Sequence, residues 1–283
     1  MMRLTPDEVR AAIQSALAED VGTGDVTTLA CIPTHSKSTA LMVAREPLVV
    51  AGLEFAIETF LSLSPNLTIR RLATDGHRLD PGQAALEVSG STRAILTGER
   101  VALNFIQRLS GVATQTARYL EAVAGTPVKI LDTRKTTPGW RRFEKYAVAC
   151  GGGTNHRVGL YDLILIKDNH LAALAGEQPN AIAAAVARSR AMYPALQVEV
   201  EADKLAQVRQ AVDAGADIVL LDNMALPDLR EAVAIVAGRA KTEASGGITL
   251  STIRGVAETG VDFISVGALT HSARAVDLGL DFV

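Results

Sequence analysis

The sequence contains few cysteines and no long apolar segment. Its two cysteines, Cys31 and Cys150, lie far apart and form no CxxC pair, so neither a cysteine metal site nor a disulfide is expected. No apolar run reaches the roughly 18 residues that a membrane-spanning helix requires. The first residues also lack the apolar core of a signal peptide. These absences predict a cytoplasmic protein that does not act at a membrane.

Neither sign of charge dominates the chain, which carries 28 Lys and Arg against 31 Asp and Glu and a net charge of -3. Positive side chains are nevertheless concentrated between Lys129 and His170, where few acidic residues offset them. Nucleic-acid binding usually needs a broader basic surface. The local concentration therefore predicts a small, highly anionic ligand and argues against a nucleic-acid partner.

The N-terminal part of the sequence mixes helical and strand patterns. Thr5, Pro6 and Glu8 form the signature of a helix start, with an N-cap, a proline at the first turn and a capping box. Further helices are expected at 53–63, 91–111 and 112–124, and strands at 38–46, 67–73 and 84–90. This order predicts an α+β arrangement with antiparallel strands.

The pattern changes after residue 125, where short apolar strands alternate with helices. The expected strands lie at 128–131, 162–166, 196–200, 217–221, 240–245 and 262–267, with a shorter one near 153–157. Nearly continuous apolar strands separated by helices are typical of a parallel sheet covered by helices. The number of units favours an incomplete α/β barrel, and an open doubly wound sheet is the alternative.

Polar residues gather where these strands end. In a parallel α/β barrel all such ends face one mouth, which holds the active site. The residues concerned are Thr133, Arg134, Lys135, His156, Arg157, Lys167, Glu201, Asp222, Ser245, Gly246, Gly247, Gly267, Ala268 and, shortly afterwards, His271. This mixture predicts an active-site mouth rather than ordinary strand exits.

These side chains divide by chemistry. The cations suit carboxylates or phosphates, whereas Glu201 and Asp222 suit hydroxyls, a metal cation or a developing positive charge. The glycines after the last two strands allow a ligand to approach the backbone, and barrels commonly bind phosphate there. Together they predict a phosphorylated sugar, an organic acid and a divalent metal as ligands.

Long strings of the sequence resemble the quinolinate phosphoribosyltransferase family. They are GDVTT, ERVALNFIQRLSG, LDTRKTTPGWR, EKYAVACGGGTNHRVGLYDLILIKDNH, VEVE, IVLLDN, EASGGI and VGALTHS. The resemblance implies conversion of quinolinate and phosphoribosyl pyrophosphate to nicotinate mononucleotide, pyrophosphate and carbon dioxide, with Mg²⁺, in NAD biosynthesis. It also implies an α/β fold with an N-terminal α/β sandwich at 1–110, a seven-stranded incomplete barrel at 111–270, and a segment at 271–283 that returns to the first domain.

The resemblance also implies residue roles. Arg134, His156, Arg157 and Lys167 are expected to bind quinolinate, and Arg100 is expected to reach it from the other subunit of a homodimer. Lys135, Lys167, Glu201 and Asp222 are expected to take part in the chemistry, the two acids also facing Mg²⁺, directly or indirectly. The phosphate and sugar surroundings are expected to be Ser245, Gly246, Gly247, Val266, Gly267, Ala268 and His271, with Thr133 beside them.

Three alternatives remain at this point. A Schiff-base aldolase of the same barrel type would use Lys167 as its nucleophile. A paralogue from a molybdenum-transport operon would share the fold but not the activity. A protein that only binds a metabolite would need neither Glu201 nor Asp222.

Overall fold

The computed structural model describes residues 2–283, which divide into two compact units. The first unit contains the chain up to Ala117 together with Thr137–Gly152 and Ser272–Val283. The second contains Arg118–Thr136 and Gly153–His271. Residues 137–152, which the sequence assigned to the barrel, therefore pack in the first unit.

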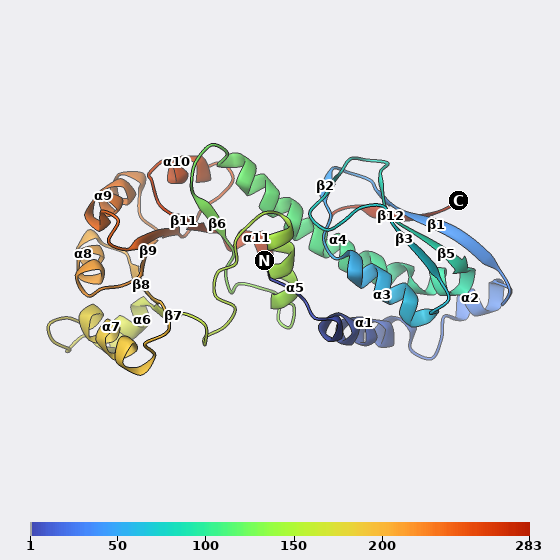
Figure 1. The fold of residues 1–283 in the computed structure, drawn as a ribbon, viewed down its shortest axis with the longest axis horizontal. Helices are drawn as coiled ribbons and strands as arrows, with labels where there is room; N and C mark the ends of the chain where they lie inside the picture. The colour runs from blue at the N-terminus through green and yellow to red at the C-terminus, as the bar shows by residue number, and fades with distance from the viewer. Residues whose placement is uncertain (1) are drawn as a thin grey trace. The chain divides into compact units, whose positions relative to one another are not determined.

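An antiparallel four-stranded sheet organises the first unit, in the order β12-β1-β5-β3. Its strands are β1 (Lys37–Ala44), β3 (Thr68–Arg71), β5 (Ala84–Ser91) and β12 (Leu278–Phe282). A separate two-stranded sheet pairs β2 (Leu48–Val49) with β4 (Arg78–Leu79). Because β12 pairs with β1, the last residues of the chain complete the sheet that the first domain begins (Figure 1).

Within the described residues, the first unit also contains five helices: α1 (Pro6–Val21), α2 (Val26–Cys31), α3 (Leu53–Leu63), most of α4 (Thr92–Ala122) and α5 (Arg141–Cys150). The capping box expected at Thr5 and Glu8 is confirmed, as is the helix expected at 53–63. The two helices expected between 91 and 124 are instead one continuous helix, α4. Apolar side chains of α3 and α4, among them Phe60 and Ile106, form one core with the sheet.

Aromatic packing explains why residues 137–152 belong to the first unit. Trp140 stacks on Phe105 of α4 with ring centroids 5.0 Å apart, and Phe143 meets Phe55 edge-on at 5.1 Å. Glu144, fully buried, accepts a hydrogen bond from Arg108 at 2.7 Å. Large rings contribute heavily to a core, so these contacts hold α5 against α3 and α4. The alternation of strands and helices gave no sign of this exchange.

A six-stranded parallel sheet forms the second unit, in the order β6-β11-β10-β9-β8-β7. Its strands are β6 (Lys129–Leu131), β7 (Ile164–Ile166), β8 (Val198–Ala202), β9 (Ile218–Asp222), β10 (Lys241–Ser245) and β11 (Phe263–Ser265). The seventh strand expected near 153–157 is only an isolated bridge between Thr154 and Leu131. The fold is the expected α/β arrangement, with six strands rather than seven.

Helices alternate with the strands of the second unit. They are α6 (Asp168–Ala173), α7 (Ala181–Met192), α8 (Leu205–Asp213), α9 (Leu226–Val236), α10 (Ile253–Ala257) and α11 (Ala268–His271). The helices α7 to α10 lie on the outer side of the curved row of strands (Figure 1). All strands run in parallel, so their carboxyl ends share one edge of this unit. Among residues 2–283, no helix is long and apolar enough to cross a membrane.

Candidate active site

The carboxyl ends of the parallel strands surround a cavity of about 700 Å³. It is lined by Thr133, Arg134, Lys135, His156, Arg157, Leu165, Lys167, Asp168, Glu201, Leu220, Asp222, Asn223, Glu243, Ser245, Gly246, Gly247 and Ser265. Eleven of the residues selected from the sequence, from Thr133 to Gly247, are in this set. The remaining five, Arg100, Val266, Gly267, Ala268 and His271, are not.

Arg134 and Arg157 concentrate positive charge at the cavity. The Arg134 Nε is buried and, within the described residues, has no hydrogen-bond partner. Burial lowers the pKa of Arg157, and repulsion from the Arg134 guanidinium lowers it further. Two guanidinium groups that repel each other in a partly desolvated environment are stabilised by a bound anion. Because the guanidinium group is planar, each can bind a carboxylate through two hydrogen bonds.

His156 is fixed by its backbone as well as by its ring. Asp132, fully buried at the end of β6, accepts hydrogen bonds from the His156 backbone N–H at 2.8 Å and from Asn155 Nδ2 at 2.7 Å. The Arg157 backbone N–H donates to His156 Nδ1 at 2.7 Å. The position of the ring therefore depends on Asp132, a residue that the sequence did not single out.

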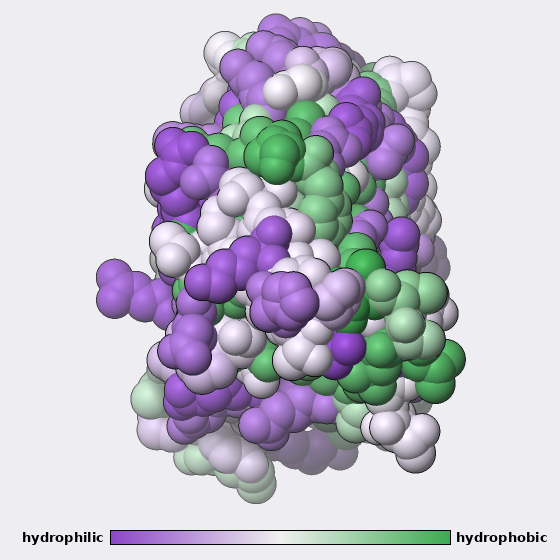
Figure 2. Space-filling view, turned by 90° about the vertical axis from the view of Figure 1, so that its right-hand side faces the viewer, coloured by the Kyte–Doolittle hydropathy of each residue, from purple (hydrophilic) through white to green (hydrophobic). Residues whose placement is uncertain are grey.

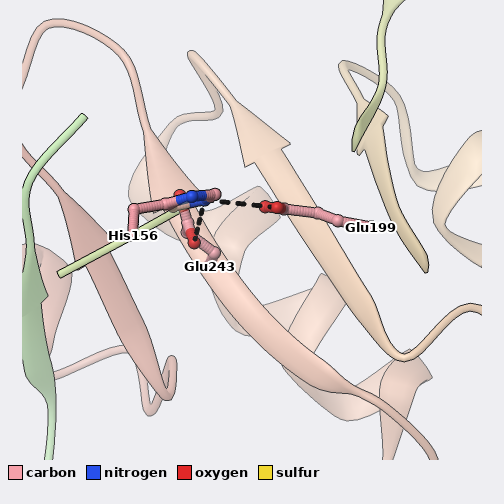
Figure 3. Close-up of side chains that lie close together, drawn as sticks. All are labelled: His156, Glu199 and Glu243. Atoms are coloured by element: carbon pink, nitrogen blue, oxygen red, sulfur yellow. Dashed lines mark ion pairs between the residues drawn. The ribbon is translucent and has the colours of Figure 1, made fainter. Parts of the chain in front are cut away.

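Two buried carboxylates, Glu199 of β8 and Glu243 of β10, point toward the His156 ring (Figure 3). The His156 Nε2 is 3.2 Å from Glu199 Oε2 and 3.4 Å from Glu243 Oε2. These distances are within ion-pair range, although none of the four carboxylate oxygens makes a well-directed hydrogen bond within the described residues. Burial disfavours the charged imidazole, but the two carboxylates outweigh it and raise the pKa of His156 to about 10. Burial disfavours the charged carboxylate of Glu199 and therefore raises its pKa.

Nearer the mouth, Lys167 and Glu201 form an ion pair with Nζ and Oε2 2.7 Å apart. Asp222 accepts a hydrogen bond from Asn223 Nδ2 at 2.7 Å, and the sheet register sets it directly beside Ser245. The other oxygen of Glu201, Oε1, accepts a longer hydrogen bond from the Asp168 backbone N–H at 3.5 Å. Glu201 of β8 and Asp222 of the neighbouring strand β9 thus line the same cavity.

Two glycines allow close packing at this edge of the sheet. A Cβ on Gly246 would come within 2.2 Å of Asn223 Oδ1, and its φ of +97° is one that other residues rarely adopt. A Cβ on Gly267 would lie 3.0 Å from both Lys135 Cδ and His271 Nε2. Gly267 does not line the cavity, but the absence of a side chain there allows Lys135 and His271 to pack beside the end of β11.

Several lining residues escaped the sequence analysis, most notably Glu243. A glutamate in the middle of a buried strand is a signal that sequence reasoning could have used, because charged residues are seldom fully buried without a purpose. Leu165, Leu220 and Ser265 gave no such signal, since they are ordinary residues for a strand. Arg100 lies on the exposed surface of α4 in the first unit.

Two family models match the chain. The C-terminal domain of quinolinate phosphoribosyl transferase matches residues 112–281, and the N-terminal domain matches residues 25–110. These matches cover nearly the whole chain and include both compact units.

Individual relatives agree with these models. The chain is 43% identical to the nicotinate-nucleotide pyrophosphorylase [carboxylating] of Mycobacterium leprae, over 97% of each protein. It is 41% identical to the probable enzyme of that name from Bacillus subtilis, over 97% of the chain and 93% of the relative. A solved nicotinate-nucleotide pyrophosphorylase from Francisella tularensis superposes with a TM-score of 0.94 at 41% identity, covering 100% of this chain and 98% of the other. The chain belongs to the quinolinate phosphoribosyltransferase family.

Proposed function

We propose that the cavity at the strand ends is where this chain carries out the reaction of its family. The chain transfers the phosphoribosyl group of phosphoribosyl pyrophosphate to quinolinate and releases pyrophosphate and carbon dioxide. The product is nicotinate mononucleotide, and the activity belongs to NAD biosynthesis. The Schiff-base aldolase and the molybdenum-operon paralogue receive no support from these relatives.

The pair of guanidinium groups, Arg134 and Arg157, is the observation that carries the assignment of the quinolinate site. Their mutual repulsion and the unpartnered Arg134 Nε favour a ligand with two negative charges. Quinolinate is a dicarboxylate, so it can neutralise both guanidinium groups at once. His156 and Lys167 line the same cavity and complete the set of residues that we assign to this substrate.

The assigned positions suit the transfer step. When the cations bind both carboxylates of quinolinate, the pyridine nitrogen of the substrate is held in one position. This removes much of the entropy cost of aligning the nitrogen with the sugar carbon that it attacks. As pyrophosphate leaves, positive charge develops on the ribose ring. Glu201 and Asp222 are placed to stabilise this charge or to accept hydrogen bonds from the ribose hydroxyls.

The other ligands are assigned from the same cavity and from the family resemblance. Lys135 and Thr133 are proposed to meet the phosphates of the sugar substrate. The glycine turn at Ser245, Gly246 and Gly247 and the neighbouring segment from Val266 to Ala268, with His271, are proposed to surround the 5-phosphate. The absence of side chains at the glycines supports this assignment, because it allows a phosphate to reach the backbone N–H groups.

A magnesium ion is proposed to accompany the sugar substrate. Mg²⁺ prefers oxygen ligands and is often held by one or two carboxylates together with substrate phosphates. Glu201 and Asp222 are two such carboxylates on one cavity, and a carboxylate can accept further contacts beside the hydrogen bonds it already has, so the donor set fits. The ion would offset the negative charge of the leaving pyrophosphate.

A homodimer is proposed from the family resemblance, which implies that Arg100 of one subunit reaches the cavity of its partner. Arg100 is exposed on α4, one helical turn from Thr97, whose hydroxyl donates to Asp25 at the start of α2. On α2, Val26 and Leu29 are exposed by 76% and 53%. Figure 2 shows apolar groups among the hydrophilic ones on the side of the molecule where α2 lies. Exposed apolar residues in the same unit as Arg100 are suited to an interface with a second subunit.

A coupled assay tests the function as a whole. Quinolinate, phosphoribosyl pyrophosphate and Mg²⁺ are expected to give nicotinate mononucleotide, carbon dioxide and pyrophosphate in equal amounts. Nicotinate serves as the control acid, because it lacks the second carboxylate and should not be turned over. Turnover of nicotinate in place of quinolinate would move the chain to a sister activity.

Mixing two inactive variants tests the shared site. Arg100→Ala and Lys167→Ala are each expected to be inactive alone, whereas a mixture should recover part of the wild-type activity. The reason is that a hybrid dimer contains one cavity with both residues intact. Subunit exchange is verified with two differently tagged variants. A mixture that exchanges subunits but stays inactive would show that Arg100 does not act across an interface.

A further inference from the structure

The guanidinium group of Arg157 is held by the segment of chain that follows it. Residues 157–163 connect Arg157, which lines the cavity, to strand β7 and belong to neither a helix nor a strand. The Arg157 Nη1 donates a hydrogen bond across this turn to the Leu163 carbonyl at 3.2 Å. The position of the guanidinium therefore depends on where the turn 157–163 holds the Leu163 carbonyl.

The carboxylate of Asp162 closes this turn. The Val158 backbone N–H donates to Asp162 Oδ2 at 2.7 Å, and the Gly159 backbone N–H donates to Asp162 Oδ1 at 3.0 Å. One side chain thus binds two successive backbone groups, one with each oxygen. Hydrogen bonds to an ionised acceptor are roughly twice as strong as those between neutral groups. Asp162 therefore supplies strong contacts in a segment where no helix or strand fixes the backbone.

Apolar packing contributes little to the conformation of the turn. The two side chains at its tip, Leu160 and Tyr161, are exposed by 72% and 74%, so they gain little from burial. The two ends of the segment are fixed, because the His156 backbone N–H binds Asp132 at 2.8 Å and the Ile164 N–H donates to the Gln197 carbonyl at 3.0 Å. Between these ends the path of the backbone depends largely on the hydrogen bonds of Asp162.

The charge of Asp162 also acts on Arg157. Burial and the Arg134 guanidinium lower the pKa of Arg157, whereas the negative charges of Glu199 and Asp162 oppose this lowering. An acid near a partly desolvated guanidinium favours its charged form. Asp162 is thus linked to Arg157 in two ways, through the backbone of the turn and through its charge.

We propose that Asp162 is a positioning residue for quinolinate, because it holds the turn whose Leu163 carbonyl orients the Arg157 guanidinium for the substrate carboxylate. Asp162 itself is not among the residues that line the cavity, so it acts through Arg157 rather than on the substrate. A guanidinium that is already oriented loses less rotational freedom when it binds the carboxylate, which favours tight binding. This inference rests on the proposed binding of quinolinate by Arg157.

The first test compares Asp162→Asn and Asp162→Ala with the wild type. Asparagine keeps the size of the side chain and one acceptor oxygen, whereas alanine removes both acceptors. Asp162→Asn is expected to weaken quinolinate binding on the order of tenfold in a calorimetric titration, and Asp162→Ala to weaken it further. The KM for phosphoribosyl pyrophosphate and the kcat at saturating quinolinate should stay within about twofold of the wild type, because the defect concerns one substrate only.

A double-mutant cycle shows whether Asp162 acts through Arg157. In an Arg157→Lys background the bond from Nη1 to the Leu163 carbonyl is already lost, so adding Asp162→Asn should weaken quinolinate binding by less than about twofold. A tenfold loss in both backgrounds would contradict the proposed path. Asp213→Asn is the matched control and should bind quinolinate as the wild type does, since that acid lies at the end of α8 with its side chain 71% exposed.

The remaining outcomes are separable. An unchanged quinolinate affinity in both Asp162 variants would show that the turn does not orient Arg157. An equal rise of KM for both substrates would show that Asp162 only maintains the fold of the second unit, and a lowered thermal unfolding temperature would accompany it. Either result overturns the role of Asp162 while leaving the proposed function intact. A wild type that neither binds nor turns over quinolinate would overturn the proposed function and this inference with it.

Discussion

Replacing Arg134 with alanine is expected to abolish measurable quinolinate binding. The guanidinium lies partly buried in the cavity, and its Nε has no partner among the described residues. Removing one partner of a desolvated charge pair usually costs about 3 to 5 kcal/mol, which corresponds to a loss of affinity on the order of 10²- to 10⁴-fold. The dicarboxylate would keep Arg157 but lose its bidentate contact to Arg134.

Calorimetric titration with quinolinate measures this loss directly, without requiring turnover. Arg134→Lys distinguishes charge from geometry, because lysine retains the positive charge but cannot form the planar two-point contact. Its affinity should fall between those of the wild type and Arg134→Ala. Arg209→Ala is the matched control, since that arginine is exposed on α8 and pairs only loosely with Glu231 at 3.5 Å. Wild-type affinity in Arg134→Ala would exclude this residue from the quinolinate site.

The sequence could predict the site from Thr133 to Gly247 because strand ends are local signals. Each parallel strand leaves the core through a polar residue, and parallel packing brings these ends to one edge regardless of the detailed geometry. The strings TRKT and NHR were enough to predict Arg134 and Arg157 as site residues. The cavity in the second unit contains both of them.

Other features depended on packing that no local pattern contains. Residues 137–152 lie between two barrel strands in the sequence, yet Trp140 and Phe143 find aromatic partners in the first unit. The expected seventh strand failed because the segment after Gly153 makes only one bridge, at Thr154, before turning to place Asn155 and His156 on Asp132. In both places side-chain contacts outweighed the strand–helix alternation.

The buried acids show a third kind of limit. Glu199 and Glu201 alternate along β8, and the sequence favoured Glu201 because it ends the strand. Only the structure shows that Glu199 and Glu243 converge on one imidazole from two strands that are not neighbours in the sheet. A spatial cluster of this kind cannot be derived from spacing alone.

Replacing Glu201 with alanine is expected to reduce kcat on the order of 10²- to 10³-fold, the second large effect. The Glu201 carboxylate is proposed to face the ribose as positive charge develops on it, so its removal raises the energy of the transition state more than that of the bound substrates. Lys167 would also lose its ion-pair partner at 2.7 Å and leave a positive charge beside the reacting sugar. Both consequences act in the same direction.

Steady-state kinetics with each substrate varied in turn measures this effect, and quinolinate titration shows whether binding survives. Asp203→Asn is the matched control, because Asp203 is an acid two residues further along the chain whose side chain is 58% exposed and does not line the cavity. Glu201→Gln should lose almost as much kcat as Glu201→Ala, since an amide cannot stabilise positive charge. Recovery of kcat in Glu201→Gln would instead assign the residue to hydrogen bonding with the ribose hydroxyls. Because the carboxylate acts on the transition state, a loss confined to the KM of either substrate would contradict this role.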